Sequence, residues 1–151
     1  MPMEIVDTLG FLRGTWAIVR SIEDHRIGTR GSFKGTATIS AVPIGCHVAL
    51  EARAHYAEVG EVRFGTHTGQ ARRTLEYRQL DDVTVMIYFA NGRPFVDLDL
   101  STGAWQSDHL CGDDRHEIAT FVRSGNIVEE RWRVQGPMTN YEAIAIHTRV
   151  R

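Results

Sequence analysis

The sequence predicts an all-β fold, a single antiparallel up-and-down β-barrel of about nine or ten strands that follows a short N-terminal helical turn. Three observations predict it. Apolar and polar residues alternate with period two along most of the chain after Gly14. Short turn signals rich in Gly, Asn and Asp separate the alternating segments. No later segment has the helical length needed to cover a sheet, and a sheet of this size tends to close on itself. A two-sheet sandwich is the alternative, because alternation alone does not separate the two.

Length and charge limit the function classes. The 151 residues, 42% of them hydrophobic, suit one domain over 1–151. Lys+Arg 17 against Asp+Glu 19 gives a net charge of −2, which argues against nucleic acid as a partner. No apolar run approaches the ~20 residues that span a bilayer, so no membrane partner is expected. The acidic N-terminus lacks a secretory signal, and Cys46 and Cys111 are the only cysteines. We therefore expect a cytoplasmic protein with reduced thiols.

The helical turn lies at the N-terminus. Ile5, Leu9 and Leu12 are spaced i, i+4, i+7, Asp7 is placed to cap the turn, and Gly14 ends it.

Alternation then predicts each strand in order. The strand at 15–22 places Trp16, Ile18 and Ile22 on one face, and Arg20 shares that face. The strand at 71–80 places Arg73, Leu75 and Tyr77 together. The remaining strands are expected at 31–39, 46–56, 104–111, 116–123, 127–134 and 141–150.

The hairpin at 83–100 has the clearest turn signal, Asn91-Gly92. A two-residue loop there pairs Phe89 with Pro94, Ile87 with Val96 and Val85 with Leu98. One face is then wholly apolar. The other is expected to point away from the core and carries Met86, Tyr88, Phe95, Asp97 and Asp99.

The stretch Leu12-Arg13-Gly14-Thr15-Trp16 resembles the opening of the calycin barrels, the superfamily of lipocalins and fatty-acid-binding proteins. Those chains enter the first strand through a helical turn and Gly-x-Trp. The resemblance implies a lipocalin-like barrel whose Trp closes the floor, often against a basic side chain of a late strand. Arg131, Arg133 and Arg149 are the candidates for that side chain.

Other motifs resemble an uncharacterised bacterial family of about this length. They are Gly92-Arg93-x-Phe95-x-x-Leu98-Asp99-Leu100, His109-x-Cys111-x-x-Asp114 and Trp132-x-Val134-x-Gly136-Pro137 followed by Tyr141. That family supplies a fold and no activity.

Nitrobindin-like haem barrels share the calycin plan and carry their haem-ligating His at the start of the last strand. This sequence has Asn140-Tyr141 there, and His147 follows with a parity opposite to the apolar face. Haem is therefore disfavoured as a cofactor.

Several ionisable residues share the apolar faces. Arg20 and Arg73 are expected inside, as are Glu130 and, with Ile144 and Ile146, Glu142. Burying an unpaired ion costs several kcal/mol, so each inward arginine needs a carboxylate. The partner is either internal, with Glu130 or Glu142 the obvious choices, or the carboxylate or phosphate of a ligand.

The segment 109–116 is the densest group of reactive residue types. His109 and Cys111 share a strand face with Trp105 and Ser107. A structural zinc site usually needs four ligands in close pairs, and only this pair is visible, so no metal site is expected. His109 has the intrinsic pKa of a general acid or base, with Tyr77 or Glu130 to assist.

Three functions follow. The first is a small-molecule binding protein that holds a partly apolar, anionic ligand inside the barrel. Its expected ligand-binding residues are Arg20, Arg73, Tyr77, Trp105, His109, Cys111, Glu130 and Trp132, with an apolar wall of Leu50, Leu75, Val85, Ile87, Phe89 and Leu98. The second is an acid–base isomerase, lyase or hydratase that uses His109. The third is a packed barrel that acts through its surface, such as a homodimer joined by Tyr88 and Phe95.

Overall fold

The computed structural model describes residues 3–42 and 52–150. One short helix, α1 (Thr8–Leu12), precedes the strands. The ten strands are β1 (Gly14–Asp24), β2 (Thr29–Ala41), β3 (Arg53–Phe64), β4 (His67–Gln79), β5 (Thr84–Phe89), β6 (Pro94–Asp99), β7 (Ala104–Cys111), β8 (Asp114–Ser124), β9 (Ile127–Gly136) and β10 (Thr139–Arg149).

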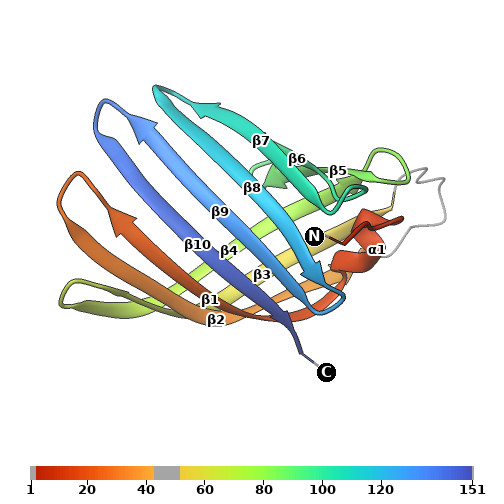
Figure 1. The fold of residues 1–151 in the computed structure, drawn as a ribbon, viewed down its shortest axis with the longest axis horizontal. Coiled ribbons are helices and arrows are strands. Elements are labelled where there is room, and N and C mark those ends of the chain that lie inside the picture. The colour runs from red at the N-terminus through yellow and green to blue at the C-terminus, as the bar shows by residue number, and fades with distance from the viewer. Residues whose placement is uncertain (1–2, 43–51, 151) are drawn as a thin grey trace.

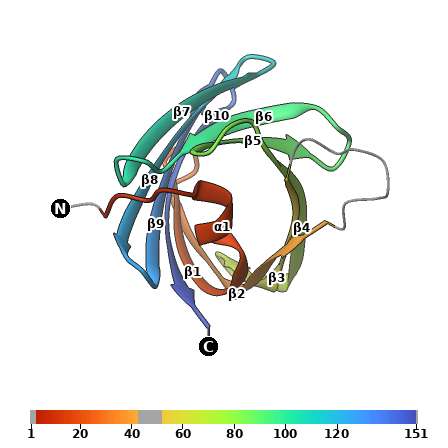
Figure 2. The same cartoon turned by 90° about the vertical axis from the view of Figure 1, so that its right-hand side faces the viewer.

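The strands form one antiparallel sheet in the order β6-β5-β4-β3-β2-β1-β10-β9-β8-β7. Strands consecutive in sequence pair with each other, except β6 and β7, and β1 pairs with β10, so the connectivity is up-and-down. The sheet coils into a nearly closed barrel, and α1 lies in one of its openings (Figures 1 and 2). The predicted fold class is therefore confirmed.

Closure is completed by side chains between β6 and β7, the two end strands of the hydrogen-bonded order. Trp105 on β7 donates its indole Nε1–H to the Asp97 carbonyl oxygen at 3.1 Å and to Asp97 Oδ1 at 3.2 Å. Ser107 donates its hydroxyl to the same Oδ1 at 2.8 Å. Asp97 was expected to point away from the core. It lies half-buried between β6 and β7. These two strands share no backbone hydrogen-bond ladder, and the Asp97 carboxylate links them by accepting side-chain hydrogen bonds from β7 instead.

The α1 end of the barrel is the floor. Asp7 caps α1 by accepting the Gly10 N–H, and Gly14 adopts a φ of 127° where the chain turns into β1, as the sequence predicted. Trp16 is 2% exposed and donates its indole N–H to the Leu12 carbonyl. Arg149 of β10 lies 4.2 Å over the Trp16 ring and donates to the Phe11 and Arg13 carbonyls. Of the three expected basic partners for Trp16, the structure selects Arg149.

A pair of glycines lets β2 and β3 approach closely in the middle of the barrel wall. Gly35 and Gly60 are direct cross-strand partners. A Cβ on Gly35 would lie 2.2 Å from the Val59 carbonyl oxygen and 2.9 Å from the Phe33 ring. The Phe33 ring therefore occupies the space that side chains would take at both positions, and the Arg20 guanidinium lies 5.0 Å over that ring.

The predicted register of the 83–100 hairpin is partly wrong. Val85 pairs with Leu98 and Ile87 with Val96 as expected, but Tyr88, not Phe89, pairs with Pro94. The irregularity beside Ile87 turns Phe95 inward, where it is 6% exposed. Phe95 was predicted to be exposed and to form an interface with Tyr88. Because Phe95 is buried, this part of the prediction is wrong.

The face assignment of the last strand is also wrong. Ala143 and Ala145 are buried, whereas Ile144 is 46% and Ile146 is 36% exposed. Glu142 therefore points outward with them, and His147 points inward. The interior of β10 is lined by small residues, so the larger isoleucines misled the hydrophobicity argument. The strand expected at 46–56 begins at Arg53 and continues to Phe64. Cys46 and Leu50 lie outside the described residues.

No helix in the described parts of the chain is long and apolar enough to cross a membrane.

Candidate functional site

The barrel interior contains a cavity of about 60 Å³ that reaches from the floor to Trp132. Residues of all ten strands and of α1 line it; most of them are apolar, while a few polar side chains from different strands converge on it. Besides Trp16 and Phe95, the polar and aromatic lining residues are Tyr56, Arg73, Tyr77, Asp97, Trp105, Ser107, Thr120, Glu130, Trp132 and His147. Such a mixture of an apolar wall and few polar groups is typical of small-molecule sites.

Glu58 is the centre of the buried charge network beside this cavity. Arg20 donates to both carboxylate oxygens, at 3.2 Å and 2.9 Å, and the Tyr56 hydroxyl donates at 2.6 Å. Burial alone raises the pKa of the Glu58 carboxyl. The hydrogen bonds from Arg20 and Tyr56 and the charges of Arg73 and Arg20 outweigh burial and lower that pKa to about 2. Glu58 is thus a permanent anion whose bonding capacity is mostly used.

Arg73 is the cation of this network whose hydrogen-bonding groups are least satisfied. Its only hydrogen bond to Glu58 is long, 3.4 Å from Nη2 to Oε1. Its Nε is buried and has no hydrogen-bond partner. The guanidinium lies 5.7 Å from the Tyr56 ring centroid and 5.4 Å from that of Trp132. The side chain lines the cavity and keeps 33% of its surface uncovered.

Two further titratable groups meet the same space. Glu130 accepts a hydrogen bond from the Trp132 indole N–H. His147 contributes an imidazole whose Nε2 is buried without a partner. Burial lowers the pKa of His147, and the Glu130 charge only partly opposes this, so the ring is neutral at pH 7.

Two tyrosines complete the polar part of the wall. The Tyr56 and Tyr77 rings are stacked with centroids 5.8 Å apart. Burial raises the pKa of both phenols, so both stay protonated at physiological pH.

The structure brings some of the sequence-predicted site residues together. Arg73, Tyr77, Trp105, Glu130 and Trp132 line the cavity. Arg20 is also interior but does not line the cavity, and it is paired with Glu58. An internal ion pair was one of the expected arrangements, but with Glu130 or Glu142 as the carboxylate.

Two predicted residues lie elsewhere. His109 packs against Phe95 and faces His116 across the β7–β8 pair, with ring centroids 5.9 Å apart. Cys111 is exposed at the end of β7. Among the residues that the structure describes, neither lines the interior cavity.

Sequence reasoning missed Glu58 and His147. For Glu58 a signal existed, because the alternation of Ala54 and Tyr56 continues to it once the strand is extended beyond residue 56. For His147 the alanines of β10 gave no signal.

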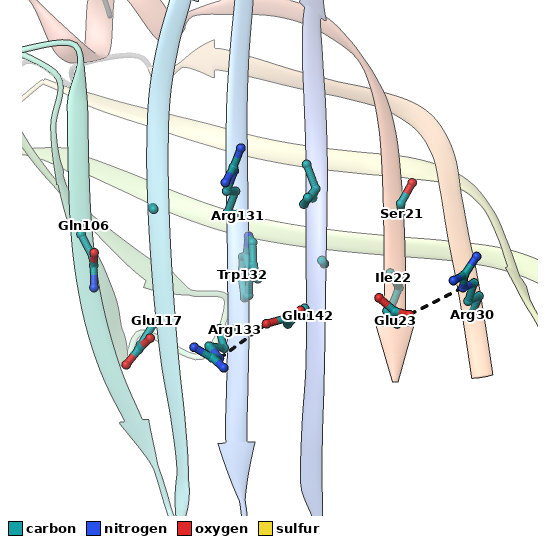
Figure 3. A pocket seen from close by; sticks show the side chains of 14 residues that line it. Ser21, Ile22, Glu23, Arg30, Gln106, Glu117, Arg131, Trp132, Arg133 and Glu142 are labelled. Atoms are coloured by element: carbon teal, nitrogen blue, oxygen red, sulfur yellow. Dashed lines mark ion pairs between the residues drawn. The ribbon is translucent and has the colours of Figure 1, made fainter. Parts of the chain in front are cut away.

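A larger hollow of about 530 Å³ lies on the outer face of the barrel, over β1, β2 and β7–β10. Figure 3 shows its charged side chains and two ion pairs between them. Glu23 lies 3.6 Å from Arg30, and Glu142 lies 3.6 Å from Arg133. Because its charges are exposed and mutually paired, this groove has no polar group in need of a ligand.

One side-chain cluster in the described ranges has the composition of a metal site. Glu23, His25 and Glu142 each offer a ligand atom, and these atoms lie within 4.8 Å of one another. All three are exposed, and His25 Nε2 lies 3.2 Å from Glu142 Oε2. The ion pairs to Arg30 and Arg133 already provide cations for both carboxylates, so the cluster is explained without a metal.

Comparison with solved structures supports the fold. The S-type phycobiliprotein lyase CPES from Guillardia theta superposes with a TM-score of 0.65 at 6% identity, over 95% of this chain and 90% of the lyase. A DUF3598-family protein of unknown function from Nostoc punctiforme gives a TM-score of 0.61 at 13% identity, over 96% of this chain and 50% of that one. At these identities the likeness concerns the fold alone. No curated protein matches the chain.

A family described as of unknown function, DUF6314, matches residues 12–149 of the chain. The match covers most of the chain, and the protein belongs to this family.

Proposed function

We propose that the protein binds a small, partly apolar anion inside the barrel, with Arg73 as the anchor. The observation that carries the proposal is the unequal use of the two interior arginines. Glu58 gives both oxygens to Arg20, so Arg73, which lines the cavity, retains a buried Nε without a partner and a partly uncovered side chain. A carboxylate is the matched ligand, because it accepts two parallel hydrogen bonds from a guanidinium.

The rest of the wall fits the apolar part of such a ligand. Leu75, Ile87, Phe95 and Trp105 line the cavity opposite and beside the arginine. The free volume of about 60 Å³ holds a group of few atoms. A ligand with a ring or a longer chain therefore requires side chains to move, and the β6–β7 seam, held by side chains rather than a backbone ladder, is the part of the wall that yields most easily.

Titration calorimetry with benzoate and its uncharged relative benzamide tests this function. We expect saturable benzoate binding and at least about tenfold weaker benzamide binding, since a hydrogen bond to a charged group contributes about 1.5–3 kcal/mol. The Arg73→Leu variant should bind both compounds equally weakly. Arg72→Leu is the matched control, because Arg72 is the adjacent arginine on the outer face of β4 and is exposed.

An unchanged benzoate affinity in Arg73→Leu would remove Arg73 as the anchor. Equal affinities of the wild-type protein for benzoate and benzamide would remove the anion itself.

The acid–base alternative has its predicted catalytic residue, His109, apart from the two residues that were expected to assist it. Tyr77 and Glu130 line the cavity, but His109 stands in the aromatic cluster with Phe95 and His116. No described contact joins His109 to the two residues that were expected to assist it.

A further inference from the structure

His147 brings a proton-accepting nitrogen to the cavity that holds Arg73. The residue lies on β10, where it pairs with Ile18 of β1 on one side and Val128 of β9 on the other. Neither neighbour offers its ring a hydrogen bond, and its Nε2 is buried and unpartnered. A buried polar atom without a partner is destabilising, and a partner supplied by a ligand removes that cost.

The charges around His147 come from five strands. Arg20 on β1, Glu58 on β3, Arg73 on β4 and Glu130 on β9 all act on its imidazole. Asp97 on β6 lies on the same cavity wall, where its carboxylate is bound to Trp105 and Ser107. These two cations and three anions give the interior a net charge of −1 when His147 is neutral.

A bound carboxylate makes this interior −2. Burying an additional uncompensated charge costs several kcal/mol, unless a group of opposite charge forms with it. His147 is the one cavity-lining side chain within the described residues whose charge changes near neutral pH. Protonation at Nε2 returns the interior to −1 and converts the unpartnered nitrogen into a donor.

We propose that the barrel takes up its anion together with one proton, which His147 accepts from solvent at Nε2. The ligand enters as a carboxylate and remains one, and the new imidazolium and Arg73 share its charge. The carboxylate and the proton together add no net charge to the interior, although the ligand is bound as an anion beside a protonated histidine. This inference rests on the proposed function, and it adds that affinity depends on pH.

The proton is measured directly by calorimetry. Benzoate is titrated into the protein at pH 7.5 in phosphate and in Tris, because the two buffers release very different heats on giving up a proton. We expect uptake of between about one half and one proton per benzoate bound, and benzoate affinity that falls up to about tenfold per pH unit as the pH rises.

The His147→Gln variant should bind benzoate with the same heat in both buffers and with an affinity that varies little between pH 6 and 8. His109→Gln is the control, because His109 lies outside the cavity wall, and it should keep the proton uptake. If His147→Gln fails to fold, the C2–H resonance of His147 in the wild-type protein provides the readout, and benzoate should raise the pKa that this resonance reports.

The failures are distinguishable. Benzoate binding that depends on Arg73 but takes up no proton overturns this inference and leaves the proposed function standing. Proton uptake that persists in His147→Gln assigns the proton to another group, such as Glu130, and also overturns it. Absence of benzoate binding from pH 5 to 8 overturns both.

Discussion

Arg20 of β1 holds Glu58 of β3 with both terminal nitrogens of its guanidinium, at 3.2 Å and 2.9 Å, over the intervening strand β2. This pair is the reason that Arg73, the direct cross-strand partner of Glu58 on β4, is left with a single long bond to the same carboxylate. Of the two arginines that contact Glu58, Arg20 is thus the structural partner and Arg73 is the cation available to a ligand.

The first prediction concerns Glu58→Gln. The substitution keeps the shape of the side chain but leaves Arg20 and Arg73 without their buried anion, so we expect a loss of about 3–5 kcal/mol in the free energy of unfolding. Urea denaturation measures it. Glu61→Gln is the matched control on the same strand, because Glu61 pairs with Arg63 at the surface and should change stability by less than about 1 kcal/mol. Equal losses in the two variants would show that the buried pair is not what stabilises this wall.

The second prediction concerns acid stability. The pKa of Glu58 is about 2 in the folded protein against the ordinary 4.5, so the folded state binds fewer protons than the unfolded state in this range. Its contribution is therefore complete above about pH 4.5 and is lost as the pH falls from there toward 2. The shift corresponds to about 3 kcal/mol. Urea midpoints measured at a series of pH values should fall across this window in the wild-type protein, and the fall should be reduced by that amount in Glu58→Gln.

The third prediction concerns the two neutral histidines. Burial lowers the pKa of both His147 and His116, so the unfolded chain binds protons that the folded chain does not. Stability should therefore decline as the pH drops below the ordinary histidine pKa of 6.5. His147→Gln should flatten this decline between pH 6.5 and 5, when unfolding is followed by tryptophan fluorescence. A decline as steep as that of the wild-type protein would assign the effect to His116 or to another group.

The fourth prediction concerns Gly35→Ala. A Cβ there would stand 2.2 Å from the Val59 carbonyl oxygen and 2.7 Å from the Gly60 Cα, so backbone must move. We expect a loss of about 2–4 kcal/mol and a lower midpoint of thermal unfolding. Gly125→Ala is the control, because a Cβ there has open space and its φ needs no glycine. If Gly35→Ala is as stable as Gly125→Ala, β2 and β3 are not held as close as described.

The fifth prediction concerns the β6–β7 seam. Asp97→Ala removes the acceptor of the Trp105 and Ser107 side-chain bonds, while the Trp105 bond to the Asp97 carbonyl remains. Amide hydrogens of β6 and β7 should then exchange faster, and stability should fall by about 1–3 kcal/mol. Asp108→Ala is the control, since Asp108 bonds only the exposed Arg115 in the described structure. Unchanged exchange in Asp97→Ala would mean that packing alone closes the barrel.

The fold was predictable because barrel strands carry a simple period. Trp16, Arg73 and Trp132 lie on the faces that alternation assigned, and Asp7 caps the helix that it was expected to cap. The predictions were wrong where the two-residue alternation is interrupted, or where the residues on the two faces of a strand do not differ in the expected way in hydrophobicity. The irregularity beside Ile87 turns Phe95 to the inner face, opposite to the face predicted for it. On β10 the inner face carries small alanines and the outer face carries Ile144 and Ile146, so the hydrophobic pattern assigned His147 to the wrong face.

The partner of Arg20 was not predictable for a different reason. Glu58 is separated from Arg20 by 38 residues, and only the register of β1, β2 and β3 brings their side chains together over the inner face of β2. Physical reasoning required a buried carboxylate for each inward arginine, and it did not identify which one.

The most direct test of the central claim observes the unpartnered atom itself. In the protein labelled with ¹⁵N-arginine, the Nε–H resonance of Arg73 is assigned by its loss in Arg73→Leu and is followed while benzoate is added. We predict a saturable downfield shift of this proton, with the Arg20 Nε–H nearly unmoved because Glu58 already occupies that guanidinium. Benzoate binding that leaves the Arg73 Nε–H resonance in place would contradict the assignment of Arg73 as the anchor.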